Sequence, residues 1–168
     1  MAFPSGWLFE KHSQTVHSQI LVEEFVRGRE FNVALFGYPE AQVLPLAEID
    51  FGDFPAGLHR IVGYRAKWAV TSFEYLHTPR RFPADLPGAL QADMGRLALD
   101  CFRLFGLRDY GRVDLRLDAA GRPYILEINA NPCLSPDAGF AAAVAQSNRT
   151  YPAMIREFLR ILTMRVCR

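Results

Sequence analysis

Residues 111–140 read GRVDLRLDAAGRPYILEINANPCLSPDAGF, and this stretch decides the fold of the chain. Two runs of alternating residues, VDLRL and YILEIN, flank Asp-Ala-Ala-Gly, which is a composition typical of a turn. Successive side chains of a β-strand point to opposite faces of the sheet. The stretch therefore predicts a β-hairpin with its turn at residues 118–121.

This turn sets the register of the predicted hairpin and separates an apolar face from a polar one. The expected pairs are Leu117–Arg122, Asp114–Ile125 and Arg112–Glu127. One face is then apolar except for Arg122, and the other gathers Arg112, Asp114, Glu127 and Asn129. In this register Asp114 and Glu127 are diagonal neighbours, roughly 7–8 Å apart at the backbone, so their side chains can converge on one ion.

Two interpretations of the polar face remain open at this point. Carboxylate and amide oxygens suit Mg²⁺, which commonly takes one or two carboxylates and completes its octahedron with phosphate oxygens and water. Alternatively, the face is the solvated side of an antiparallel sheet, where the acids pair with nearby arginines. The loop after Asn129, Ala-Asn-Pro-Cys-Leu-Ser-Pro, favours a site, because it would carry backbone N–H groups past the same face.

The first half of the chain predicts further strands. Alternation in residues 30–36 favours a strand that forms a hairpin with residues 21–25. Residues 41–49 predict a third strand, with Pro45 marking an edge or a bulge. We expect a fourth strand over residues 61–68 and a loop over residues 72–84.

The second half predicts helices. After Pro87, apolar residues recur at helical spacing up to Phe105, and Gly106 is a plausible C-cap. Ser135 or Asp137 is expected to cap a helix through GFAAAVA, and Thr150 with Pro152 to start an amphipathic terminal helix. Together the patterns predict an α+β fold with a mainly antiparallel sheet packed with helices.

Composition excludes several classes of protein. The chain has 168 residues, of which 50% are hydrophobic, and a net charge of +1, which argues against a disordered tail or a nucleic-acid polycation. The Arg80–Arg81 pair is too short to track a phosphate backbone. The three cysteines, Cys101, Cys133 and Cys167, lack the spacing of a metal site. With no apolar run long enough to span a bilayer and no signal pattern, a cytoplasmic protein is expected.

The run RVDLRLDAAGRPYILEINANPCLSPDAGF closely resembles the end of the ATP-grasp ligases, in particular the D-alanine–D-alanine ligase family. The likeness extends over LVEEFVRGREFNVALF, VLPLAEIDF, YRAKW and RDYGRVD, and so covers about residues 20–165. Members of this family join a carboxylate to an amine. ATP phosphorylates the carboxylate, the amine attacks the acyl phosphate, and ADP and phosphate leave.

The resemblance implies ATP and Mg²⁺ (or Mn²⁺) as cofactors and a role for each matching residue. The implied metal ligands are Asp114, Glu127 and Asn129, with Glu127 bridging two ions. Arg112 would stabilise the oxyanion of the tetrahedral intermediate, and Lys67 would reach the phosphates. The implied nucleotide contacts are Glu23 at the adenine, the Phe25–Val26 backbone along the base and Glu30 at the ribose. The implied substrate loop contains Cys133 and Ser135.

Two departures from the family concern the substrate. The family usually has glycine where Cys133 stands, so a side chain now crowds the loop. A serine that holds the substrate carboxylate in D-alanine ligases aligns with Ala138, whose methyl group cannot form a hydrogen bond. We therefore expect a ligase that acts on another amino acid or peptide.

The expected organisation is an irregular segment over residues 1–19, followed by an ATP-grasp C-terminal subdomain over residues 20–168. The glycine-rich lid subdomain and the N-terminal substrate domain are not recognisable, so the expected partners are a second copy of the chain or the missing portion of the enzyme. Two other functions remain open. One is a non-catalytic nucleotide- or metal-binding remnant that needs another chain, and the other is a two-metal phosphohydrolase.

Overall fold

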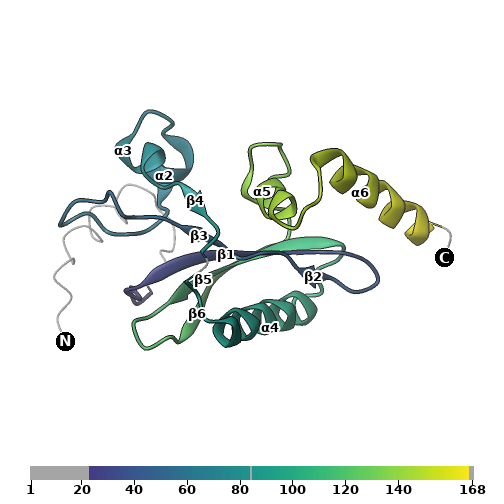
Figure 1. Ribbon diagram of the computed structural model, residues 1–168, viewed down its shortest axis with the longest axis horizontal. Helices are drawn as coiled ribbons and strands as arrows, with labels where there is room; N and C mark the ends of the chain where they lie inside the picture. The colour runs from purple at the N-terminus through teal and green to yellow at the C-terminus, as the bar shows by residue number, and fades with distance from the viewer. Residues whose placement is uncertain (1–22, 84, 167–168) are drawn as a thin grey trace, which may run out of the picture.

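The computed structural model describes residues 23–83 and 85–166, whose central element is an antiparallel sheet. Its strand order is β4-β3-β1-β5-β6, and β2 pairs with the far end of β1 (Figure 1). The strands are β1 (Arg29–Phe36), β2 (Gln42–Val43), β3 (Ala47–Ile49), β4 (Arg80–Arg81), β5 (Tyr110–Leu117) and β6 (Pro123–Asn129). The longest pairings, β1 with β5 and β5 with β6, form the middle of the sheet and one of its edges.

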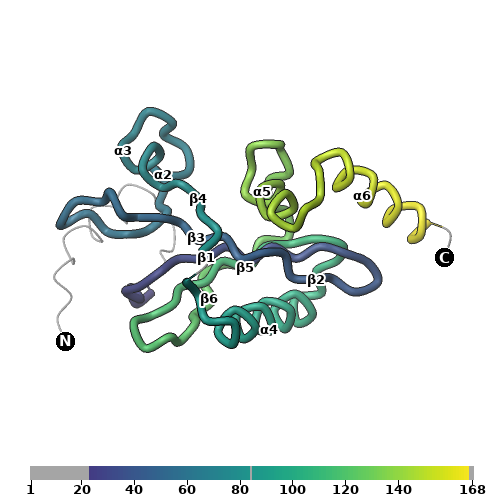
Figure 2. Tube along the Cα trace, in the orientation of Figure 1, coloured from purple at the N-terminus to yellow at the C-terminus, as the bar shows by residue number. Residues whose placement is uncertain are grey.

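Helices cover both faces of the sheet. On one side lies α4 (Gly88–Leu104), alone. On the other side stand α2 (Tyr64–Trp68), α3 (Phe73–Leu76), α5 (Gly139–Gln146) and α6 (Tyr151–Val166), with α2 and α3 apart from α5 (Figures 1 and 2). The α+β class predicted from the sequence is confirmed.

Strand alternation divides the core into two clusters. Phe31, Val33 and Leu35 of β1 face α4, where they pack with Met94 and Ala98. The intervening residues Ala34 and Phe36 face the other side and pack with Phe140 of α5 and with Met154 and Ile161 of α6. At the end of β1 that contains residues 33–36, hydrophobic side chains therefore pack on both faces of the sheet.

The other end of the same face is polar. Beyond Ala34 the repeat continues through Asn32 to Glu30, and on β5 it runs through Arg112, Asp114 and Arg116. Between α2 and α5 these side chains form the floor of a cleft.

Several predicted elements are wrong in the first half of the chain. Residues 23–27 form no strand, so the hairpin with residues 30–36 is not present in the described part; residues 21–22 lie outside it. Residues 64–68 of the predicted fourth strand are helix α2, in which only Ala66 is buried. Tyr-Arg-Ala-Lys-Trp has no sheet neighbour to pair with, and alanine, arginine and lysine favour a helix. The loop predicted for residues 72–84 contains α3 and β4.

Proline and capping chemistry explain the remaining boundaries. The predicted third strand divides into β2 and β3 around Pro45, which has no N–H to donate to a ladder. Helix α4 lies where its spacing predicted it and is followed by Gly106 in the left-handed region, φ +63°. The Thr150 hydroxyl accepts a hydrogen bond from Ala153 N–H at the start of α6, as expected. Helix α5 instead begins after Ala138 with no side-chain cap, so the prediction of Ser135 or Asp137 as its cap is wrong.

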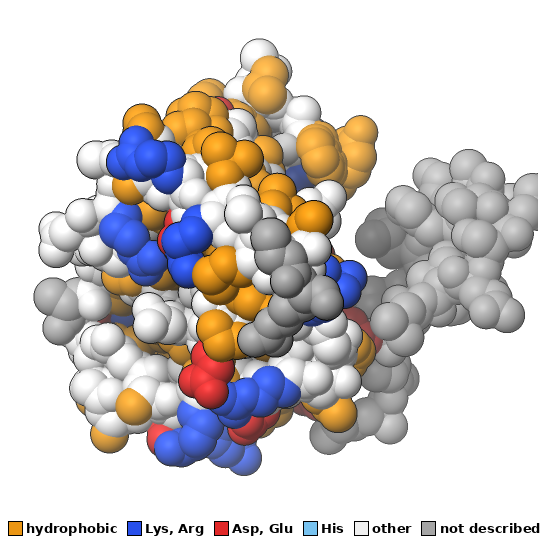
Figure 3. Space-filling model, turned by 90° about the vertical axis from the view of Figure 1, so that its right-hand side faces the viewer, with side chains coloured by type: hydrophobic (Ala, Val, Ile, Leu, Met, Phe, Trp, Pro, Cys, Tyr) orange, Lys and Arg blue, Asp and Glu red, His pale blue; other side chains and the backbone are white. Residues whose placement is uncertain are grey.

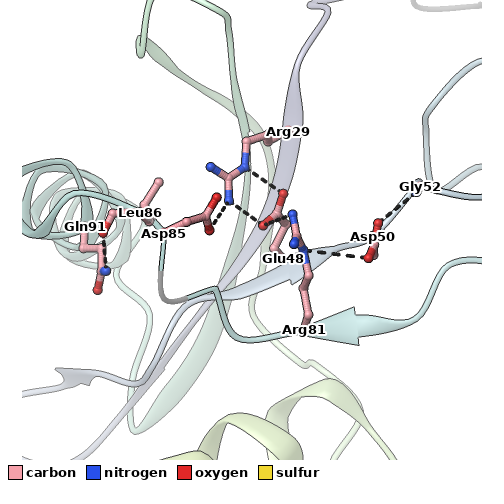
Figure 4. A network of polar contacts seen from close by, with 8 residues as sticks. All are labelled: Arg29, Glu48, Asp50, Gly52, Arg81, Asp85, Leu86 and Gln91. Atoms are coloured by element: carbon pink, nitrogen blue, oxygen red, sulfur yellow. Dashed lines mark hydrogen bonds and ion pairs between the residues drawn. The ribbon is translucent and has the colours of Figure 1, made fainter.

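An ion-pair network ties the β3–β4 edge to the start of β1 (Figure 4). Glu48 is 3% exposed and accepts two hydrogen bonds from Arg29, at 2.7 and 2.6 Å. Arg81 lies 3.1 Å from the same carboxylate, and Arg29 also reaches Asp85 at 3.2 Å. A buried carboxylate held by two guanidinium groups fixes the orientation of β4, because Arg81 must face Glu48.

The remaining surface is mixed. Viewed from the α6 end, hydrophobic side chains are exposed among lysines and arginines (Figure 3). Within residues 23–83 and 85–166, no helix is long and apolar enough to cross a membrane.

Candidate functional site

A β-bulge in β6 determines which side chains reach the polar face. Near the turn, Arg116 pairs with Tyr124 and Leu115 with Ile125, but the next pair is Asp114 with Glu127. Leu126 is therefore the extra residue. If Leu126 instead paired with Asp114 in a regular ladder, Glu127 would stand opposite Val113 and point toward α4, because a shift of one residue reverses every side chain.

The predicted register of the hairpin is therefore wrong by two residues at the site, although the predicted polar face is confirmed. Asp114 and Glu127 are direct partners rather than diagonal neighbours, and Arg112 is opposite Asn129. The turn is also one residue longer than expected, since Leu117 pairs with Pro123. Asp118 explains this length, because its carboxylate accepts hydrogen bonds from the backbone N–H groups of Ala120 and Arg122, each at 2.9 Å.

The polar face is the floor of a cleft of about 1000 Å³. Its walls come from the segment before β1, from the loop and helix at residues 61–68, from β4 and from the loop leading into α5. Most of the site residues predicted from the sequence line it: Phe25, Val26, Glu30, Lys67, Arg112, Asp114, Glu127, Asn129, Cys133 and Ser135. Glu23 does not; its neighbour Glu24 lines the cleft in its place.

Asp114 lies at the centre of the floor and is held by two neighbours. The Arg112 guanidinium donates to both carboxylate oxygens, from Nε at 2.7 Å and from Nη2 at 2.8 Å. Asn32 Nδ2 donates to Oδ1 at 2.9 Å from the adjoining strand β1. Burial alone would lower the pKa of the Arg112 guanidinium, but its hydrogen bonds and ion pair with Asp114 raise it above the ordinary value. The Arg112 guanidinium therefore stays charged although it is largely buried.

Glu127 and Asn129 lie beside this pair, on β6. Lys67 Nζ of α2 reaches to 3.6 Å from Glu127 Oε2, and both side chains remain substantially exposed, at 43% and 47%. Asn129 Oδ1 accepts a hydrogen bond from the backbone N–H of Asn131 at 2.9 Å, and Asn131 Oδ1 accepts one from the Tyr110 hydroxyl at 2.5 Å. The loop after β6 is therefore fixed in place next to the two acids.

A buried ion pair closes the end of the floor nearest to Phe25. Arg116 is 2% exposed and donates from Nη1 to Glu30 Oε2 at 2.8 Å. It also donates to the Arg60 carbonyl from both Nη atoms, at 2.7 and 2.5 Å, and lies 5.0 Å from the centre of the Phe25 ring. Burial raises the pKa of Glu30, and the hydrogen bond from Arg116 only partly offsets this.

Cys133 and Ser135 face each other in the loop before α5. The thiol and the hydroxyl are 2.9 Å apart, and hydrogen bonds with the side chain and backbone of Ser135 lower the pKa of the exposed Cys133 thiol. Both residues line the cleft, together with Ala138 at the start of α5.

Several residues that line the cleft were not assigned from the sequence, and three of them, Asn32, Arg116 and Arg80, matter for the site. Asn32 and Arg116 follow the same alternation as Glu30 and Asp114, but only the pairing of β1 with β5 shows that they meet at one site. The third is Arg80, whose strand was predicted as a loop.

Comparison with known proteins identifies the family. A family model described as the D-ala D-ala ligase C-terminus matches residues 9–160. The chain belongs to this family. Its fold is accordingly that of the C-terminal part of the D-alanine–D-alanine ligases, within the ATP-grasp superfamily.

Curated relatives and solved structures that match the chain include D-alanine–D-alanine ligases. The chain is 35% identical over 141 residues to the uncharacterized protein y4sG of Sinorhizobium fredii, and 33% identical over 149 residues to a D-alanine–D-alanine ligase of Albidiferax ferrireducens. These matches cover 84% and 88% of the chain. The D-alanine–D-alanine ligase of Bacillus anthracis superimposes with a TM-score of 0.66 at 19% identity, over 86% of the chain and 42% of that ligase. Another crystal structure of the Bacillus anthracis ligase, in complex with ATP, gives a TM-score of 0.59 at 20% identity, over 83% of the chain and 39% of that protein.

The chain spans 40% of the length of each of those two curated relatives.

Proposed function

We propose that this chain is the C-terminal part of the catalytic core of an ATP- and Mg²⁺-dependent carboxylate–amine ligase. The observation that carries the proposal is the pairing of Asp114 with Glu127 across β5 and β6, inside a cleft that also holds Arg112 and Lys67. Two acids within reach of two cations suit a site for phosphate groups and a divalent metal.

The donor set fits Mg²⁺ or Mn²⁺, and we assign Asp114, Glu127 and Asn129 as its ligands. All three offer hard oxygen atoms. Within the described part of the chain no three His, Cys, Asp or Glu side chains come together, so the protein supplies an incomplete shell. That is the arrangement expected for a metal that shares its coordination with phosphate oxygens, and it disfavours a two-metal phosphohydrolase with its larger set of ligands. A bound ion would neutralise phosphate charge.

The nucleotide is assigned to the half of the cleft between Phe25 and α2. Apolar side chains in the lining of the cleft suit a purine base, and the Phe25–Val26 backbone would run along that base. These side chains are Ile49, Ile61, Val62, Trp68 and Leu126. Glu23 remains our proposed adenine contact on the resemblance alone, whereas Glu24 lies in the cleft. Glu30 is proposed for the ribose. To bind the ribose hydroxyls, the Glu30 carboxylate would have to accept hydrogen bonds from them as well as from Arg116.

In the proposed reaction, a substrate carboxylate oxygen attacks the γ-phosphorus of ATP and ADP leaves. The amine nitrogen then attacks the acyl carbon and phosphate leaves as the C–N bond forms. Lys67 would hold phosphate oxygens, and Arg112 would donate to the oxyanion of the tetrahedral intermediate, where charge develops most strongly. Arg112 is positioned for this by its double hydrogen bond to Asp114.

The substrate differs from that of a D-alanine ligase in our proposal. Ala138 offers a methyl group where the family has a serine, and a missing hydrogen bond to a charged group costs about 1.5–3 kcal/mol, or roughly one to two decades in affinity. Cys133 adds a side chain to the same loop. We expect an acceptor other than D-alanine alone.

The test is phosphate release by the full-length gene product, with a carboxylate labelled with ¹⁸O. Formation of an acyl phosphate transfers ¹⁸O to inorganic phosphate, and a screen of amino acids and dipeptides identifies the acceptor. Phosphate released without ¹⁸O would show hydrolysis by water. Nucleotide binding without any release would support a non-catalytic chain that needs a partner, either the preceding portion of the core or a second copy. Efficient D-alanyl-D-alanine synthesis that is unaffected by Ala138→Ser would refute the altered specificity.

A further inference from the structure

Two adjacent arginines of β4 lie on opposite faces of the sheet. Arg81 pairs with Glu48, inside the network of Figure 4. Arg80 is aligned with Ile49, and both residues line the cleft. Because successive side chains alternate across a strand, the anchoring of Arg81 directs Arg80 into the cleft.

Three arginines line the cleft, and within the described part of the chain Arg80 is the one without an ion pair to a carboxylate. Arg112 holds Asp114 and Arg116 holds Glu30. Asp137 attracts Arg80 through a charge interaction without a hydrogen bond, and the Arg80 side chain forms no hydrogen bond within residues 23–83 and 85–166.

The surroundings of Arg80 add positive rather than negative charge. Its side chain lies against Gly139, where an added Cβ would come within 3.0 Å of its Nε. Gly139 begins α5, whose N-terminus carries partial positive charge and has no side-chain cap. Arg80 is exposed as a whole, but partial loss of water lowers the pKa of its guanidinium, and the charge of Arg112 lowers it further. An anion bound in the cleft would offset the repulsion between these two guanidinium groups and would also be attracted by the helix N-terminus.

The geometry points to Arg80 as the residue that binds the free carboxylate of the amine substrate, an amino acid or a short peptide. The inference rests on the proposed ligase function, which places the reacting carbonyl at Arg112. The planar guanidinium offers two parallel donors to a carboxylate, and Ala138, next to Gly139, offers none.

The site is tested on the purified chain without ATP or metal, by NMR of arginine Nε–H groups. The probes are N-acetyl-D-alanine and its neutral amide, N-acetyl-D-alaninamide. We expect the acid, and not the amide, to shift the Arg80 resonance. Arg80→Gln should weaken binding of the acid by about ten- to hundredfold, because it removes charge-assisted hydrogen bonds, and Arg80→Lys should lie between. Asp137→Asn should strengthen binding, since it removes the competing anion.

Arg96→Gln is the matched control, because Arg96 lies on α4 across the sheet and should leave binding unchanged. Equal shifts from both probes, or binding unchanged in Arg80→Gln, would overturn the inference. MgATP titration of Arg80→Gln separates it from the proposed function. If Arg80→Gln and the wild type bind MgATP equally well but neither binds N-acetyl-D-alanine, the proposed role of Arg80 is wrong and the ligase proposal is unaffected. If the acid binds as described but MgATP does not, the ligase proposal fails.

Discussion

The Arg116–Glu30 pair under the cleft allows a quantitative prediction about stability. The two side chains are 2% and 8% exposed, so neither is compensated by water when its partner is removed. Arg116→Met keeps most of the side-chain volume but leaves the Glu30 carboxylate buried without a counter-charge. Removing one partner of a buried pair typically costs about 3–5 kcal/mol.

The pH dependence of this loss identifies its cause. Burial already raises the pKa of Glu30 above its unfolded value, and the hydrogen bond from Arg116 works against that rise. In Arg116→Met the pKa of Glu30 therefore rises further. A carboxyl whose folded pKa is raised stabilises the folded state as pH falls, because the folded form binds the proton more tightly. The penalty is thus full above the folded pKa and shrinks as pH falls through it.

Urea denaturation followed by circular dichroism at pH 8 and pH 5 measures both effects. We expect Arg116→Met to lose about 3–5 kcal/mol at pH 8 and clearly less at pH 5. The double variant Glu30→Gln/Arg116→Met should recover part of the loss at pH 8. The control Arg96→Met removes an exposed arginine paired with Asp93, and should change the free energy of unfolding by less than about 1 kcal/mol. An equal loss for Arg116→Met at both pH values would refute the reasoning.

Three further predictions concern the bulge, the core and the turn. Deleting Leu126 removes the bulge but leaves Glu127 opposite Asp114 and Asn129 opposite Arg112, so Mg²⁺-dependent ATP binding should persist, as it should in Leu126→Ala; calorimetric titration checks this, and loss of the Mg²⁺ dependence in the deletion variant would contradict the assignment of Leu126 as the extra residue. Met154→Ala empties a fully buried position between α6 and the sheet, and should cost about 2–5 kcal/mol in urea denaturation, with exposed Ile155→Ala as the smaller control. Gly121→Ala places a Cβ at φ +77° in the turn and should cost about 1–2 kcal/mol by the same measurement; no loss would contradict the positive φ.

The sequence predicted the polar face of the hairpin but not the spacing of the two acids on it. The alternation in residues 112–117 and 124–129 depends only on the backbone of a strand, so the polar face follows directly from it. The register instead depends on the number of residues in the turn. Asp118 binds two backbone N–H groups and lengthens the turn, and the bulge at Leu126 then restores Glu127 to the polar face. Neither device has a distinctive residue pattern.

Tertiary pairing limited the prediction elsewhere. The sequence of residues 64–68 has no periodicity strong enough to distinguish a short strand from a short helix. These residues form helix α2 because no neighbouring strand is available to pair with them. Arg80 is a similar case. Arg80 lies in the cleft because β4 pairs with β3, which is more than 30 positions earlier in the chain, and because Arg81 forms an ion pair with Glu48 on the opposite face. Nothing in the local sequence distinguishes the two arginines.

Titration of the chain with ATP, with and without Mg²⁺, by isothermal calorimetry tests the central claim most directly. We expect weak ATP binding that Mg²⁺ strengthens, because Asp114 and Glu127 face each other in the cleft. Glu127→Ala should abolish the dependence on Mg²⁺. Asp93→Ala, which removes an exposed acid on α4, should leave it intact. Mg²⁺-dependent binding that persists unchanged in Glu127→Ala would contradict the assignment of the site.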